Sequence, residues 1–399
     1  MYQAKIQELL NLQKKTKPTL IQERTFDLIK DGSNLVAYAK TGTGKTLAYG
    51  LPALEKVVPG EANSLVIFLP TTELAVQVRN ALNPFIAKLG LKGITLVGAG
   101  NRSRQEERLK KLHPEVLVCT PGRFFDFFSS GRIKKEQIKM LVIDEADDLL
   151  EFTKLELLTS LGQNLNSDSQ IILFGATDSQ LTDQADEIFM RNFVEVDVRP
   201  EQKLPIQHYF LQVDNRHKVD FVQRLIKLPH FHGIMFFDSN QALLKFAGIF
   251  GHTKTKFAIL STDFGKQKRE EALRNFRNGD VKLLLATDLA ARGLDIPGLT
   301  YVVNFEIPAD QETYTHRSGR VGRMNNQGTV VTLGNDHDLR NLEKLIDEKL
   351  IRVYFDKSKL STKMPKKTVE APKTNKPKKK KKRKNKNKGY HPHFLKEKK

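Results

Sequence analysis

The chain has 399 residues and a formal net charge of +20, from 66 Lys and Arg against 46 Asp and Glu. This length corresponds to two or three domains, and the single Cys119 excludes an internal disulfide framework and a cysteine-based zinc site. There is no long apolar run and no signal-peptide pattern, so we expect a soluble cytoplasmic protein with a polyanionic partner and no membrane contact.

The segment 1–198 alternates short apolar stretches with helical patterns. The expected strands are 35–39, 65–69, 115–119, 140–143 and 170–174, and a helix is expected over 74–89. Several of these strands are apolar almost throughout, which is typical of parallel strands that helices cover on both faces. We therefore predict a doubly wound α/β domain over this segment.

A polar segment with two prolines, 199–206, is expected to link this domain to a second one over 207–355. The alternation of strands and helices restarts there. The expected strands are 233–237, 257–260, 282–286, 301–304 and 328–333, with a helix over 267–277. Two domains of one α/β architecture are therefore plausible from the pattern.

The last segment, 356–399, is a polycation with 19 basic and 3 acidic residues. It cannot form a core and its charges repel one another, so we expect a disordered tail. Flexible cations would tether the protein to RNA in a salt-dependent way. A solvated solubility tail and a nuclear-import signal are the alternatives.

The sequence AKTGTGKT at 39–46 lies between an expected strand and a helical pattern. Small residues let the backbone curl so that successive N–H groups point at phosphate oxygens, and the following helix adds its dipole. Lys45 would reach the β- and γ-phosphates, and Thr46 would bind Mg²⁺. The expected ATP-binding residues of this turn are Thr41, Gly42, Thr43, Gly44, Lys45 and Thr46.

Asp144 and Glu145 directly follow the expected strand 140–143. Two acids at the carboxyl end of a buried strand lie where doubly wound folds bind their ligands. Asp144 would hold Mg²⁺, and Glu145 would orient and deprotonate the water that attacks the γ-phosphate.

The run Asp144-Glu145-Ala146-Asp147 resembles the motif that names the DEAD-box RNA helicases, within helicase superfamily 2. The resemblance covers residues from about 10 to 350, with the family's motifs in order. Further matching segments are 17–22 for the Q motif, 70–75, 99–100, 120–123, 175–177, 287–295 and 316–323. The resemblance implies two tandem RecA-like domains with parallel sheets, with ATP and Mg²⁺ as cofactors and RNA as partner.

The resemblance also implies a role for each matching residue. Gln22 would read adenine, and Asp295 would contact the ribose across the cleft. Arg320 and Arg323 would act as arginine fingers, completing a catalytic set with Lys45 and Glu145. The residues implied in coupling ATP use to RNA are Gly175, Ala176, Thr177, His316 and Arg317.

Six further positions match residues that contact the nucleic-acid backbone in this family. They are small, polar or basic, which suits phosphate and 2′-hydroxyl contacts that hold a strand without reading its bases. These positions are Thr71, Gly100, Thr120, Arg123, Arg269 and Thr287.

We therefore predict an ATP-dependent RNA helicase, an RNA-dependent ATPase that unwinds short RNA duplexes or remodels ribonucleoprotein. We expect a monomer that acts on ribosomal or structured messenger RNA. Thr72, Gly175 and Lys266 depart from the family's usual Arg, Ser and Gln. Thr72 and Gly175 motivate one alternative, an ATP-gated RNA clamp with weak unwinding. The others are a superfamily 2 DNA helicase and a nucleotide-independent RNA chaperone.

Overall fold

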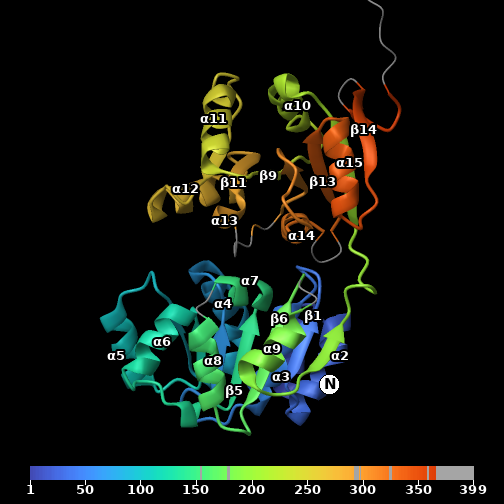
Figure 1. Cartoon of the computed structure of the whole chain (residues 1–399). Helices are drawn as coiled ribbons and strands as arrows, with labels where there is room; N and C mark the ends of the chain where they lie inside the picture. The colour runs from blue at the N-terminus through green and yellow to red at the C-terminus, as the bar shows by residue number, and fades with distance from the viewer. Residues whose placement is uncertain are drawn as a thin grey trace, which may run out of the picture.

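The computed structural model describes residues 1–152, 155–177, 180–291, 296, 298–322, 326–356 and 359–364. They form two lobes, each a β-sheet of mainly parallel strands with helices on both faces (Figure 1). The predicted fold of two α/β domains is confirmed. No helix in the described part of the chain is both long enough and apolar enough to cross a membrane.

The first lobe holds a seven-stranded sheet with the order β3-β4-β2-β5-β6-β1-β7, parallel throughout. The strands are β1 (Leu35–Tyr38), β2 (Leu65–Phe68), β3 (Gly93–Leu96), β4 (Val116–Cys119), β5 (Met140–Asp144), β6 (Gln170–Gly175) and β7 (Val194–Asp197). The sequence predicted the five central strands but missed β3 and β7. These two are the edge strands, whose partly exposed residues break the continuous apolar pattern.

Helices cover both faces of this sheet, with a separate apolar core under each layer. One face carries α1 (Ala4–Leu12), α2 (Leu20–Asp31), α3 (Lys45–Lys56) and α4 (Thr72–Lys88). The other carries α5 (Arg102–Leu112), α6 (Pro121–Ser129), α7 (Ala146–Phe152), α8 (Leu155–Asn164) and α9 (Leu181–Phe189), and the 3₁₀ turn η1 (Lys135–Gln137) precedes β5. Because Leu35 and Ala37 of β1 face one core and Val36 and Tyr38 face the other, the strand is apolar throughout.

The second lobe holds an eight-stranded sheet with the order β10-β11-β9-β12-β13-β8-β14-β15. The strands are β8 (Ile206–Gln212), β9 (Gly233–Phe237), β10 (Ala258–Leu260), β11 (Leu283–Thr287), β12 (Tyr301–Asn304), β13 (Gly328–Gly334), β14 (Ile351–Asp356) and β15 (Lys359–Ser361). Its helices are α10 (Lys218–Leu225), α11 (Asn240–Gly251), α12 (Lys266–Arg277), α13 (Asp288–Ala291), α14 (Gln311–Ser318) and α15 (Asp336–Leu345), with the 3₁₀ turn η2 (Asn215–His217). The core under α10 and α11 is separate from the core under α12 to α15.

The structure corrects two details of the predicted segments. Ile206, assigned to the linker 199–206, is the first residue of β8. The predicted tail 356–399 begins inside a hairpin, because β15 pairs antiparallel with β14 and Leu360 packs against the core of the second lobe. The apolar pair Phe355 and Leu360 extends the folded region past the first cations of the tail. Residues 365–399 lie outside the described residues.

Parallel strands place their carboxyl ends at one edge of a sheet. In the first lobe, the residues that follow β1, β5 and β6 lie at this edge and approach α14 of the second lobe (Figure 1). A Cβ on Gly319, just after α14, would come 2.7 Å from Thr41 Cβ in the turn after β1. The two lobes thus meet where the sequence placed its chemical motifs.

Candidate functional site

The phosphate-binding turn connects β1 to α3, as predicted. Gly42 and Gly44 have φ of 80° and 98°, a conformation that residues with a Cβ rarely adopt. A Cβ on Gly44 would also lie 2.8 Å from Gln22 Nε2. The Thr41 hydroxyl is buried and has no hydrogen-bond partner among the described residues. A curled backbone that opens α3 at Lys45 suits the binding of a phosphate chain.

Lys45 is held against the carboxylates that follow β5. Its side chain is 6% exposed, and Nζ lies 3.2 Å from Glu145 Oε2. Burial alone lowers the pKa of the Lys45 ammonium, but three carboxylates, Glu145 foremost, outweigh burial and raise it overall. Lys45 therefore remains a cation in a site with little water, where it attracts phosphate more strongly than in solvent.

Glu145 has an unusual backbone conformation. Its φ of 49° lies in the left-handed region, which is unfavourable for a residue with a Cβ. Strain of this kind is often found at functional sites, where surrounding contacts impose it. The Glu145 N–H donates to Asp144 Oδ1 at 3.0 Å, and its carboxylate pairs with Lys45. The turn therefore directs the Glu145 carboxylate towards the phosphate-binding turn.

Asp144 is buried beside Tyr49, a residue of α3. Asp144 is 4% exposed, and its Oδ2 accepts a hydrogen bond from the Tyr49 hydroxyl at 2.7 Å. Burial, together with the charge of Glu145, raises the pKa of Asp144 to about 6. The Thr46 side chain also lies close to the Tyr49 hydroxyl, so the Thr46 hydroxyl and the Asp144 carboxylate are neighbours. Hard oxygen donors of this kind suit Mg²⁺, which would offset the electrostatic cost of ionising Asp144.

Gln22 connects α2 to the phosphate-binding turn. Its Oε1 accepts a hydrogen bond from the Thr19 N–H at 3.1 Å, which also caps α2, and its Nε2 donates to the Gly44 carbonyl at 3.3 Å. The side chain therefore lies beside the turn that would hold the phosphates. Its predicted contact with adenine stays a prediction.

The Asp147 carboxylate accepts several hydrogen bonds from the turn that follows β6. Its Oδ2 accepts from the Ala176 N–H at 2.8 Å, the Thr177 N–H at 3.0 Å and the Thr177 hydroxyl at 2.7 Å. Burial by itself raises the pKa of Asp147, but His316, Lys45 and these hydrogen bonds lower it below its usual value. Gly175, Ala176 and Thr177, predicted to couple ATP use to RNA, are thus tied to the DEAD segment.

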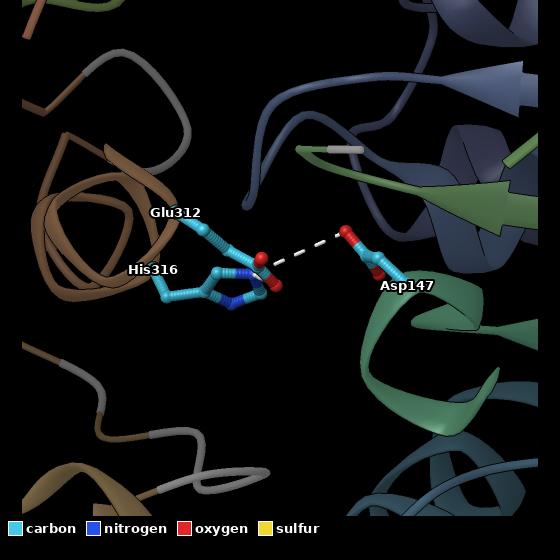
Figure 2. A group of neighbouring side chains, drawn as sticks. All are labelled: Asp147, Glu312 and His316. Atoms are coloured by element: carbon cyan, nitrogen blue, oxygen red, sulfur yellow. Dashed lines mark ion pairs between the residues drawn. The ribbon is translucent and has the colours of Figure 1, made fainter. Parts of the chain in front are cut away.

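His316 faces Asp147 from the other lobe. Figure 2 shows Glu312 and His316, both on α14, directed towards Asp147. His316 Nε2 lies 4.0 Å from Asp147 Oδ2 and 3.7 Å from Glu312 Oε1. These separations are longer than a hydrogen bond. The segment around His316, predicted to couple ATP use to RNA, nevertheless lies close to the DEAD motif at residues 144–147.

Arg317 is buried inside the second lobe, unlike its neighbour His316. It is 2% exposed and donates to Asp288 Oδ1 at 2.7 Å and Oδ2 at 2.6 Å, and to Asp238 Oδ1 at 3.1 Å. Burial by itself lowers the pKa of Arg317. Asp288 and Asp238 raise it by more than burial lowers it, so the pKa lies above its usual value and the guanidinium stays charged. Arg317 therefore fixes α14 to the residues that follow β9 and β11.

The segment after α14 reaches the phosphate-binding turn. Gly319 allows the close approach to Thr41, because any larger residue would clash with the Thr41 side chain. Arg320 follows directly and is half-buried. This position suits the predicted arginine finger. Arg323 and Asp295, predicted as a second finger and a ribose contact, lie outside the described residues.

The predicted RNA-binding residues of the first lobe lie at the carboxyl ends of neighbouring strands. Thr71 follows β2 and caps α4 by accepting from the Leu74 N–H at 3.2 Å, and Thr120 follows β4. Arg123 is 9% exposed and donates to the carbonyls of Gly100 at 3.1 Å and Gly98 at 3.0 Å. Arg123 therefore braces the loop that carries Gly100.

In the second lobe, Arg269 and Thr287 complete the predicted set. Arg269, on α12, lies 3.8 Å from Glu73 of the first lobe, next to the motif that contains Thr71. Thr287 is buried at the end of β11. The structure thus brings Arg269 of the second lobe towards the Thr71 segment but leaves Thr287 little exposed surface.

Several residues of the site carry no clear sequence signal. Tyr49 lies one helical turn after Lys45, and this spacing was its only indication. Asp147 was noted only as part of a motif. Arg199 and Gln202 were assigned to a linker, yet Arg199 donates to the Thr177 carbonyl at 2.6 Å, and Gln202 accepts from the Lys40 N–H at 2.8 Å. Contacts between distant segments could not be seen in one sequence.

A parallel α/β lobe with this phosphate-binding turn, a carboxylate pair after β5 and an arginine segment from a second lobe defines a P-loop nucleoside triphosphatase of the RecA-like class. Residues 19–184 match the family described as DEAD/DEAH box helicase, and residues 217–325 match the helicase conserved C-terminal domain. The chain belongs to the DEAD-box family of ATP-dependent RNA helicases.

Among curated relatives, a probable ATP-dependent RNA helicase YfmL of Bacillus subtilis is 34% identical, over 90% of this chain and 97% of the relative. The DEAD-box ATP-dependent RNA helicase CshC of Bacillus cereus is also 34% identical, over 90% of this chain and 92% of that protein. Among solved structures, S. cerevisiae Dbp5 bound to RNA and ADP BeF3 has a TM-score of 0.78 at 27% identity, covering 88% of this chain and 94% of that one.

Proposed function

We propose that this chain hydrolyses ATP when RNA is bound, and uses the closing and opening of its lobes to separate short RNA duplexes or to remodel ribonucleoprotein. The observation that carries the proposal is the meeting of both lobes at one turn: Lys45 and Glu145 from the first lobe and the Gly319–Arg320 segment from the second. Its curated relatives include proteins named as ATP-dependent RNA helicases.

Each side chain would have a distinct part in hydrolysis. Lys45 would bind the phosphate chain, and Glu145 would orient the attacking water and accept its proton. Mg²⁺, held by Asp144 and Thr46, would neutralise charge on the phosphates. Arg320 would complete the electrostatic stabilisation from the second lobe, together with Arg323. Hydrolysis then depends on closure, because no described residue of the first lobe provides such an arginine at the turn.

RNA would lie along the carboxyl edges of both sheets. Thr71, Thr120 and the loop of Gly100 offer polar groups on one lobe, and Arg269 offers a cation on the other. A groove of about 850 Å³ beside Thr120 is lined by Pro70 and Phe125 among others. Contacts of this kind recognise a sugar–phosphate backbone, so we propose binding that is largely independent of base sequence.

The test measures ATP turnover and strand displacement on the same preparation. RNA is expected to stimulate turnover, while a DNA oligonucleotide of equal length and sequence stimulates it far less. An RNA duplex of about ten base pairs should be displaced when ATP is added. Equal stimulation by DNA would contradict the RNA assignment, and brisk turnover without displacement would indicate an RNA clamp.

We further propose a cytoplasmic monomer whose targets are ribosomal or structured messenger RNA. The 16 cations of residues 365–399 would add affinity for any RNA. Deleting residues 373–399 should weaken RNA binding and reduce its dependence on salt, and an unchanged salt dependence would refute the tether. Crosslinking followed by sequencing of the bound RNA would identify the targets.

A further inference from the structure

The segment that leaves the first lobe is bound to the phosphate-binding turn. Gln202 Oε1 accepts a hydrogen bond from the Lys40 N–H at 2.8 Å, and the Gln202 carbonyl accepts from Lys40 Nζ at 3.1 Å. Lys40 is the second residue of the turn, and its own carbonyl accepts from the Thr43 hydroxyl at 2.6 Å. A movement of the turn would therefore displace Gln202 directly, through these two hydrogen bonds.

Arg199 binds the same segment to the turn after β6. Its Nη1 donates to the Thr177 carbonyl at 2.6 Å, and its Nη2 and Nε donate to the Asp197 carboxylate at 2.8 and 3.0 Å. The guanidinium also lies over the Tyr38 ring, 4.4 Å from its centroid. Asp197 and Tyr38 thus hold the planar group in the orientation in which it donates to the Thr177 carbonyl.

Thr177 is in turn connected to the contact between the two lobes. Its N–H and hydroxyl donate to Asp147 Oδ2, the carboxylate that faces His316 of the second lobe. A continuous series of contacts therefore runs from the phosphate-binding turn through Gln202 and Arg199 to Thr177, and on to the lobe interface. The predicted linker thus bridges the ATP-binding turn and the residues predicted to couple ATP use to RNA.

We propose that Arg199 and Gln202 form a strap that positions Thr177 according to whether nucleotide occupies the phosphate-binding turn. Both are positioning residues, because they act through Lys40 and Thr177. The proposal rests on the proposed RNA-dependent ATPase and adds a regulatory connection to it. A purely structural brace would stabilise the first lobe without linking nucleotide to the Thr177 turn.

The first experiment compares Arg199→Met with Arg191→Met. Arg191 is a matched control, since it also donates to backbone carbonyls, including that of Asn166 at 2.7 Å. Asn166 precedes β6, so this contact lies at the amino ends of the strands, opposite the phosphate-binding turn. Arg199→Met is expected to reduce the stimulation of ATP turnover by RNA about tenfold, the loss of one charge-assisted hydrogen bond. The RNA-free rate should stay within about twofold of wild type, and Arg191→Met should leave the stimulation ratio unchanged. Equal losses with and without RNA in Arg199→Met would overturn the strap.

The second experiment tests the other end. Gln202→Leu removes the acceptor for the Lys40 N–H and should reduce RNA stimulation by a similar factor, whereas Gln202→Glu keeps an acceptor and should restore it. The double variant Arg199→Met/Gln202→Leu should lose no more RNA stimulation than either single variant, because each substitution interrupts the same connection between Lys40 and Thr177. Multiplying effects, or failure of Gln202→Glu to restore stimulation, would contradict the proposal.

Amide hydrogen exchange provides a readout that needs no RNA activity. ADP is expected to change the exchange of the Ala176 and Thr177 amides in the wild-type protein but not in Gln202→Leu. A wild-type protein without RNA stimulation would contradict the proposed function alone, since the exchange result would still decide on the strap. Identical ADP-induced changes in both proteins would refute the strap and leave the proposed function standing.

Discussion

The two lobes hold their facing residues in different ways. On the first lobe, Lys45 pairs with Glu145 at 3.2 Å and Tyr49 donates to Asp144 at 2.7 Å, so the chemical groups are held by one another within a single lobe. On the second lobe, the buried Arg317 fixes α14, and the Gly319–Arg320 segment that follows this helix extends to the phosphate-binding turn. The first lobe thus holds its groups in a preformed arrangement, and in the proposed function the second lobe supplies Arg320 when the lobes close.

This contrast separates binding from catalysis. Substitutions in the preformed site should weaken both ATP binding and hydrolysis, because the same charges serve both. Substitutions of the arriving segment should spare binding and reduce hydrolysis, because only the closed form uses it. Two predictions test this division, and two more test how the second lobe supports α14.

The largest effect is expected for Arg320→Ala. Removing an arginine finger should lower the RNA-stimulated kcat by about 10³-fold, while the affinity for a fluorescent ATP analogue changes little. Steady-state ATPase assays and a nucleotide titration measure the two quantities. Arg340→Ala, at an exposed position on α15, is the control and should behave as wild type. Normal turnover by Arg320→Ala would show that Arg320 supplies no catalytic charge.

Lys45→Ala should reduce both quantities. The change removes the phosphate-binding cation and leaves Glu145 without its partner, so we expect a loss of about 10²- to 10³-fold in kcat/KM and clearly weaker nucleotide binding. The control is Lys110→Ala on α5, whose side chain is 55% exposed. Unchanged ATP affinity in Lys45→Ala would contradict the proposal that the first lobe provides the binding site.

Arg317→Met should mainly affect stability. It leaves Asp288 and Asp238 without their shared cation, and we expect the free energy of unfolding to fall by about 3 kcal/mol, reduced from a fully buried case because Asp238 is half-exposed. Urea denaturation measures the change. A stability within error of wild type would mean that Arg317 does not hold α14 in place.

The smallest effect is expected on the pH dependence of the free energy of unfolding, through His208, which contacts α14. His208 Nδ1 lies 2.7 Å from the Tyr314 hydroxyl, and burial, together with the charge of Lys40, lowers the pKa of His208 to about 4. The unfolded chain binds this proton near pH 6.5, so His208 makes the folded state less stable as pH falls from about 7 towards 4.

Between about pH 7 and pH 5, this single group should cost the folded state about 2 kcal/mol. His208→Gln cannot titrate, and its unfolding free energy should decline less over the same range. Denaturation curves at the two pH values provide the measurement. Equal declines in both proteins would show that the His208 pKa is not depressed.

Much of the fold followed from the sequence because the central strands are buried on both faces. Leu35–Tyr38 and Gly233–Phe237 are buried throughout, so their apolar runs marked them as parallel strands. The edge strands Gly93–Leu96 and Val194–Asp197 were missed because solvent reaches part of each. The hairpin Phe355 to Leu360 was missed because basic residues surround its few apolar side chains.

The candidate site divides in the same way. The turn at Gly42 and Gly44 and the acids after β5 could be read from the residues alone, because φ, charge and strand position are local properties of a few neighbours. Packing between distant segments was needed to show that Arg123 and Arg317 are buried braces, that Asp147 binds the Thr177 turn, and that the predicted linker binds Lys40. Those outcomes depend on which distant segments pack together, and burial and partner choice are set by that packing rather than by the identity of any one residue.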